Sequence, residues 1–121
     1  QIKRDTEMAY INQEKKNALA PAIKAVLKKH GAKATIGVRH NMTLVVKVKA
    51  NEQLDLTNVG YSINPYWYRN HYENPLTIAF LDELFAACNG QFEGAAYTNH
   101  NRSDIQTDYF DVGWYIDVEI V

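Results

Sequence analysis

Cysteine is almost absent from this sequence, since Cys88 is the only one in 121 residues. A single cysteine cannot form an internal disulfide, which favours a reducing compartment. The sequence also lacks any apolar run of about 18 residues, the length that a membrane span needs, and it shows no signal peptide. These absences predict a cytoplasmic protein with no membrane partner.

The motifs that mark common cofactor and metal sites are also missing. There is no P-loop, no GxGxxG, no HExxH and no CxxC pair, and the four histidines lack the spacing of metal ligands. Cys88 falls on an apolar helical stripe, where a buried and unreactive thiol is expected. The sequence therefore predicts no cofactor and no metal site, and an enzyme is the less favoured class.

A length of 121 residues fits one domain. An apolar fraction of 46% is enough for a hydrophobic core. Met8 and Ala9 look like a natural start. We therefore expect residues 1–7 to be a leader or disordered, and residues 8–121 to form a single α+β domain.

Charge is unevenly distributed along the chain, although the net charge is only −1. Residues 1–50 carry 11 Lys and Arg against 3 Asp and Glu, whereas residues 51–121 carry 2 against 11. In one interpretation the two halves fold together and their charges interleave. In the other, one half presents a basic face to nucleic acid or an acidic face to a basic protein. The lysines that would contact nucleic acid are Lys24, Lys28, Lys29, Lys47 and Lys49.

Apolar periodicity predicts two helices. Residues 12–30 show an i, i+3, i+4 stripe that begins at the N-cap residue Asn12 and ends before Gly31. Pro21 should kink this helix or restart it, because proline lacks a backbone donor. A second helix is expected to begin at Pro75 and to end at Gly90.

Strict alternation predicts the strands. Residues 33–50 suit a hairpin that turns near residues 40–42, or one long bent strand. In residues 112–121 apolar and other side chains alternate, which is typical of a half-buried strand that lies at the centre of a sheet or next to it. The order helix–strand–strand–helix–strand predicts an α+β domain, with an antiparallel sheet of about three strands covered on one face by two helices.

Two segments carry candidate binding residues. Residues 51–74 lack a clean period, and their aromatic and basic side chains suit a protein interface, base stacking or a cap on the core. The binding candidates in this segment are Tyr66, Trp67 and Tyr68. Further along, Asp104, Asp108 and Asp111 suit local hydrogen bonding, partner recognition or a divalent cation, although their spacing does not match an EF-hand.

Three stretches of this chain resemble a known family: YINQEKK (10–16), VRHNMTLVV (38–46) and NRSDIQTDYFDVGWYIDV (101–118). Together they are similar to the large polyvalent protein-associated domain 29 group, which comprises small domains of phages and other mobile elements. The resemblance implies a phage or mobile-element accessory protein and implies no established reaction. The surface residues that it raises as binding candidates are Arg39, His40, Arg102, Asp104, Gln106, Asp108, Tyr109 and Asp111.

These observations favour a non-catalytic interaction module that acts in the host cell cytoplasm. Its expected partner is a host protein or nucleoprotein complex, such as a defence or nucleic-acid-processing complex, and self-association stays open. One alternative is a small nucleic-acid-binding protein that uses the basic half. Another is a metal-assisted enzyme that uses the carboxylates of residues 104–111.

Overall fold

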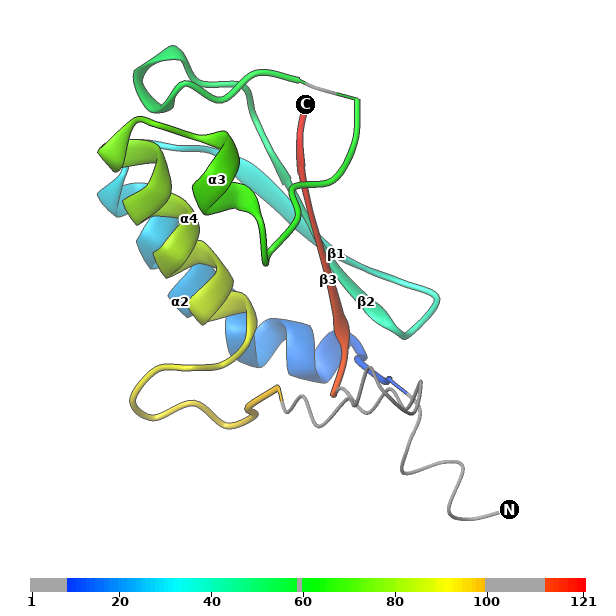
Figure 1. Cartoon of the computed structure of the whole chain (residues 1–121). Helices are drawn as coiled ribbons and strands as arrows, with labels where there is room; N and C mark the ends of the chain where they lie inside the picture. The colour runs from blue at the N-terminus through cyan, green and yellow to red at the C-terminus, as the bar shows by residue number, and fades with distance from the viewer. Residues whose placement is uncertain (1–8, 59, 100–112) are drawn as a thin grey trace.

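The computed structural model describes residues 9–58, 60–99 and 113–121. A three-stranded sheet forms one layer and the helices form the other (Figure 1). The elements in chain order are α2 (Gln13–Lys29), β1 (Ala34–Arg39), β2 (Thr43–Val48), the short 3-10 helix η1 (Glu52–Leu54), α3 (Tyr68–His71), α4 (Pro75–Cys88) and β3 (Tyr115–Ile120). The predicted α+β class is confirmed, together with its two long helices and three strands.

Helix α2 forms where the apolar stripe predicts it. The side chain of Asn12 accepts a hydrogen bond from the backbone N–H of Lys15 at 2.9 Å, which satisfies one of the free donors at the helix start. Leu19, Ile23 and Leu27 lie one helical turn apart and are buried. Pro21 lies inside the helix and does not divide it, so the predicted restart is wrong. Figure 1 shows that the helix axis bends along its length.

Helix α4 begins and ends close to the predicted residues. The Asn74 side chain accepts a hydrogen bond from the backbone N–H of Leu76, and Pro75 occupies the first turn, where a missing N–H costs nothing. The helix ends at Cys88, and Gly90 follows with a φ of 69°. This left-handed conformation is the usual glycine stop after a helix.

Strands β1 and β2 form the predicted hairpin, and the alternative of one long bent strand is wrong. The turn lies at residues 40–42, and the backbone N–H of Met42 donates to the carbonyl of Arg39 at 3.1 Å. His40 and Asn41 have φ values of 55° and 54°. Positive φ at two successive residues is what the tight type I′ hairpin turn requires, and asparagine tolerates it well.

The expectation of an antiparallel sheet is wrong for one of its two strand pairs. The strand order is β1-β2-β3; β1 pairs antiparallel with β2, whereas β3 runs parallel to β2. Parallel neighbours need a long crossover connection, usually with a helix. Here that connection contains α4, which returns the chain to the end of the sheet where β2 begins. The last strand lies next to the central strand, one of the two predicted positions.

The two faces of the sheet differ in composition because side chains alternate along each strand. The inner face packs against α2 and α4 and consists of Ala34, Ile36, Val38, Leu44, Val46, Val48, Ile116, Val118 and Ile120. The opposite side, called the outer face below, carries Thr35, Gly37, Arg39, Thr43, Val45, Lys47, Tyr115, Asp117 and Glu119. No described helix is long and apolar enough to cross a membrane.

The basic and acidic halves interleave in both layers. In the helical layer, α2 from the basic half lies beside α4 from the acidic half, and Lys29 forms an ion pair with Glu83 at 2.9 Å. In the sheet, β1 and β2 come from the basic half and β3 from the acidic half. The uneven charge distribution therefore produces contacts between the halves, as the first interpretation expects.

Candidate functional site

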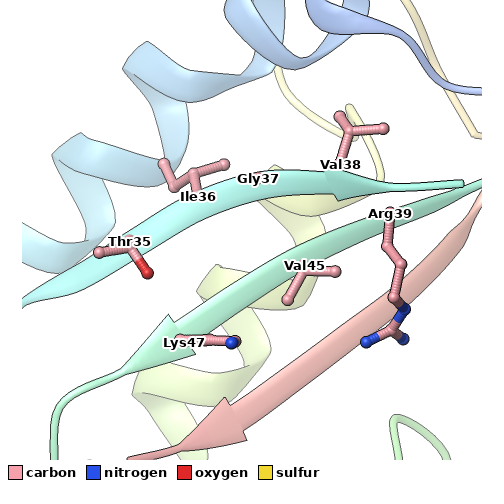
Figure 2. Close-up of a pocket in the computed structure, with 7 residues that line it drawn as sticks. All are labelled: Thr35, Ile36, Gly37, Val38, Arg39, Val45 and Lys47. Atoms are coloured by element: carbon pink, nitrogen blue, oxygen red, sulfur yellow. The ribbon is translucent and has the colours of Figure 1, made fainter. Parts of the chain in front are cut away.

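The outer face of the sheet is the candidate site, because both helices lie against the inner face (Figure 1). Gly37 sits in the middle of β1, and it lacks the side chain that would otherwise fill the surface there. A hollow of about 310 Å³ lies at this position. Figure 2 shows Ile36 and Val38 pointing to one side of the sheet and Arg39 pointing to the other, with its guanidinium reaching toward β3.

Arg39 is held in place by a carboxylate on the far strand. Its Nη2 donates to Asp117 Oδ2 at 2.7 Å, and its Nη1 lies 3.9 Å from Glu119 Oε2. The Ser62 hydroxyl donates to the other oxygen of Asp117. The Asp117 side chain is only 10% exposed, whereas that of Arg39 is 47% exposed. This arrangement fixes a guanidinium on the outer face while nearly half of the Arg39 side chain stays exposed.

Their surroundings shift the pKa values of the two carboxylates on β3, Asp117 and Glu119, in opposite directions. Burial opposes ionisation of Asp117, but the hydrogen bonds from Ser62 and Arg39 outweigh it and hold the pKa of Asp117 below its usual range. Glu119 lies two residues along the same face, and its hydrogen bond with Asp117 and the charge of Asp117 raise the pKa of Glu119. At neutral pH the site therefore keeps an ionised Asp117 facing Arg39.

We expect Asp117→Asn to lower the free energy of unfolding at pH 7 by about 1–2 kcal/mol, because it removes a charge-assisted hydrogen-bond acceptor. A carboxylate with a depressed folded-state pKa contributes stability above its unfolded pKa of about 3.9. That contribution is lost as the pH falls through the folded-state pKa of Asp117. The difference between wild type and Asp117→Asn, measured by urea unfolding, should therefore shrink below about pH 4.

Glu119→Gln is the matched control for this prediction. Because the folded state raises the pKa of Glu119, its charge opposes folding at neutral pH. Removing that charge should leave the free energy of unfolding at pH 7 unchanged or higher. A loss of stability in Glu119→Gln equal to that in Asp117→Asn would contradict the assigned roles of the two carboxylates.

The outer face is basic at the end of the sheet where β1 begins and β2 ends. A second open hollow of about 540 Å³ is lined by Lys33, Lys47 and Lys49, with Thr35 and Val121 between them. Thr35 and Lys47 also line the hollow at Gly37, so the two hollows adjoin. The outer face thus combines a basic trough on one side with the paired carboxylates of β3 on the other.

The three binding candidates of the aromatic segment differ in burial. Tyr66 and Trp67 are 73% and 56% exposed. Tyr68 is buried, stacks on Phe85 with ring centroids 5.3 Å apart, and donates its hydroxyl hydrogen to Asp82. Tyr68 therefore belongs to the core, and the other two rings are accessible to a partner.

His40 is exposed at the hairpin turn, beside Arg39.

The five lysines predicted to contact nucleic acid do not form one face. Lys24, Lys28 and Lys29 belong to α2 in the helical layer, whereas Lys47 and Lys49 lie on the outer face. Lys29 is also paired with Glu83. The sequence could not reveal this separation, because it depends on which face of the sheet α2 covers.

The other predicted site residues lie outside the described part of the chain. They are Arg102, Asp104, Gln106, Asp108, Tyr109 and Asp111. Within residues 9–58, 60–99 and 113–121, no group of three His, Cys, Asp or Glu side chains could hold a metal ion. The metal-assisted alternative rests on residues 104–111 and stays a prediction.

Asp117, Ser62, Gly37 and Lys33 belong to the site, although the sequence did not single them out. A signal existed only for Asp117, because alternation placed it on the polar face of its strand. Ser62 and Arg39 are 55 and 78 residues away from Asp117, so no local pattern connects them. What the arrangement offers chemically is a fixed guanidinium, a basic trough and an adjoining hollow.

The chain matches no protein-family model, no curated protein and no solved structure.

Proposed function

We propose that this chain is a non-catalytic interaction module of a phage or another mobile element, and that it binds a host macromolecule through the outer face of its sheet. One observation carries the binding surface: both long helices cover the inner face, no helix among the described residues lies on the outer face, and the half-exposed Arg39 there adjoins the hollow at Gly37. The resemblance to the large polyvalent protein-associated domain 29 group supports the origin.

A protein partner suits the outer face better than nucleic acid does. Asp117 and Glu119 lie on the same face as the lysines, and a phosphate backbone would be repelled there. An interface that joins a basic trough to an acidic strand suits a protein surface with both signs of charge. Arginine is also enriched at protein interfaces, where its planar head makes several hydrogen bonds.

The test is capture of a partner from a lysate of the bacterial host by wild type and by Gly37→Trp. A Cβ at Gly37 would meet no atom within 4 Å, so the substitution fills the hollow with little strain. We expect capture to weaken by at least about tenfold, because the indole occupies the centre of the binding surface. Ala25→Trp adds the same side chain at an exposed position of α2 and should leave capture unchanged.

The capture is repeated with and without nuclease, at low and moderate salt. A partner that survives nuclease and is lost only in Gly37→Trp supports the proposal. Equal capture by wild type and Gly37→Trp would contradict it.

Nucleic acid binding is the second candidate function, and the cluster of Lys33, Lys47 and Lys49 favours it. If it is correct, nuclease should abolish capture, and the affinity should fall steeply with salt because bound counterions are released. Lys47→Glu would then weaken binding much more than Lys24→Glu, since Lys24 lies in the helical layer.

A further inference from the structure

The two edges of the sheet differ in whether another segment of the chain hydrogen-bonds to their backbone groups. At the β3 edge, the backbone N–H of Ile63 donates to the carbonyl of Val118 at 2.7 Å, so the segment that precedes α3 covers part of this edge. The β1 edge has no such cover among the described residues, because none of them hydrogen-bonds to its outward backbone groups.

The ladder shows which groups of β1 are open. Lys33 accepts a backbone hydrogen bond from Lys49 at 2.8 Å, and the register then alternates bonded and non-bonded pairs along β1 and β2. The N–H and C=O groups of residues 35, 37 and 39 therefore point to β2. Those of Ala34, Ile36 and Val38 point away from the sheet.

Side chains of opposite character flank this open edge on its two sides. On the inner side, Ala22 and Val26 of α2 and Ile36 and Val38 of β1 are only partly buried, which leaves apolar surface beside the edge. On the outer side, Lys33 lies directly before β1 and shares the basic trough with Lys47 and Lys49. The Arg39 side chain, at the other end of β1, reaches across the sheet to Asp117 on β3 and so does not flank this edge.

From this geometry we infer that the β1 edge binds an extended acidic segment of a partner protein as an added strand. The inference rests on the proposed function and names the chemistry of the partner. Every second side chain of the added strand would be apolar and cover Ile36 and Val38. The alternate side chains would include a carboxylate at one end, placed beside Lys33 and the basic trough.

A second copy of this chain offers no carboxylate to Lys33. If two β1 strands paired antiparallel with full overlap, centred on Ile36, Lys33 of one copy would lie opposite Arg39 of the other, whose guanidinium is already paired with Asp117. The basic trough beside Lys33 therefore favours an acidic strand over a second β1.

The first test uses a labelled nine-residue peptide that alternates valine with threonine and carries glutamate at the outer-face position that lies beside Lys33. The control peptide carries lysine at that position. We expect the acidic peptide to bind and the lysine peptide to bind at least about twofold more weakly, as one exposed charge pair is lost. Lys33→Glu should narrow or reverse this preference. Equal binding of both peptides by wild type would overturn the inference.

The second test blocks the edge itself. Because the N–H of Ile36 points away from β2, Ile36→Pro removes no hydrogen bond of the ladder, and its ring occupies the path of the added strand. We expect peptide affinity to fall by at least about tenfold. Ile36→Val keeps the N–H and should bind nearly as well as wild type. Thermal unfolding of both variants shows whether they are folded.

Backbone amide exchange of the wild-type chain tests the inference even if Ile36→Pro does not fold. In wild type, the amides of Ile36 and Val38 should exchange fast and those of Thr35 and Gly37 slowly. Binding of the acidic peptide should slow exchange at Ile36 and Val38. Protection at other residues alone, or a doubling of mass with no peptide, would overturn the inference.

The outcomes also separate this inference from the proposed function. If host-partner capture is lost in Gly37→Trp but kept in folded Ile36→Pro, strand addition is wrong and the outer face still binds the partner. If capture is kept in both variants, the proposed function itself is wrong.

Discussion

Trp114→Ala should lower the free energy of unfolding by about 3–5 kcal/mol, the usual cost of deleting a large buried ring. Trp114 is only 3% exposed, although it lies directly before β3. Its indole N–H donates to the carbonyl of Cys88 at 3.0 Å. Its backbone N–H and C=O both bond to the Asn99 side chain at 2.9 Å. Trp114 thus fixes the start of β3 against the end of α4.

Thermal and urea unfolding measure this effect, and the melting temperature should fall by more than about 10 °C. Trp114→Phe is the matched control. It keeps most of the apolar surface and loses the hydrogen bond to Cys88, so it should cost about 1–2 kcal/mol. If Trp114→Ala were as stable as Trp114→Phe, the ring would not anchor β3, and the position of Asp117 on the outer face would need another explanation.

Gly90→Ala should have the second largest effect and lower the free energy of unfolding by about 3 kcal/mol. Gly90 has a φ of 69°, and a Cβ built there would lie 1.9 Å from the backbone oxygen of Tyr97. Both the left-handed backbone and this overlap disfavour alanine. The close approach matters because the chain after α4 folds back here and carries Asn99 to Trp114.

Gly31→Ala separates these two costs. Gly31 follows α2 with a φ of 70°, and a Cβ there would meet no atom within 4 Å. Gly31→Ala should therefore lower the free energy of unfolding only by the conformational penalty of about 1 kcal/mol. Urea unfolding of both variants gives the difference, which reports the contact between Gly90 and Tyr97. Equal costs for the two variants would show that the chain after α4 yields to the added methyl group.

Local patterns predicted the elements of this fold because their causes are local. The cap at Asn12, the proline at the start of α4 and the turn at His40 and Asn41 each depend on a few neighbouring residues. Alternation in residues 112–121 correctly separated the apolar face of β3 from the face that carries Asp117. A proline inside α2 was harder to interpret, because tertiary packing keeps the helix continuous around Pro21.

The direction of β3 and the composition of the site could not be predicted in this way. Whether β3 runs parallel to β2 depends on the end of the sheet at which the chain returns after α4. The pair of Arg39 and Asp117 exists only once that direction is set. For the same reason, a single basic face seemed plausible from the sequence, although α2 and β2 place their lysines in different layers.

The most direct test of the central claim, that the partner binds the outer face, is lysine acetylation of the captured complex followed by mass spectrometry. Lys33, Lys47 and Lys49 lie on the outer face, whereas Lys24 and Lys28 lie on α2 and serve as internal controls. We predict that the partner slows acetylation of the first three lysines and leaves the other two unchanged. Protection of Lys24 and Lys28, with Lys47 and Lys49 still reactive, would contradict the claim.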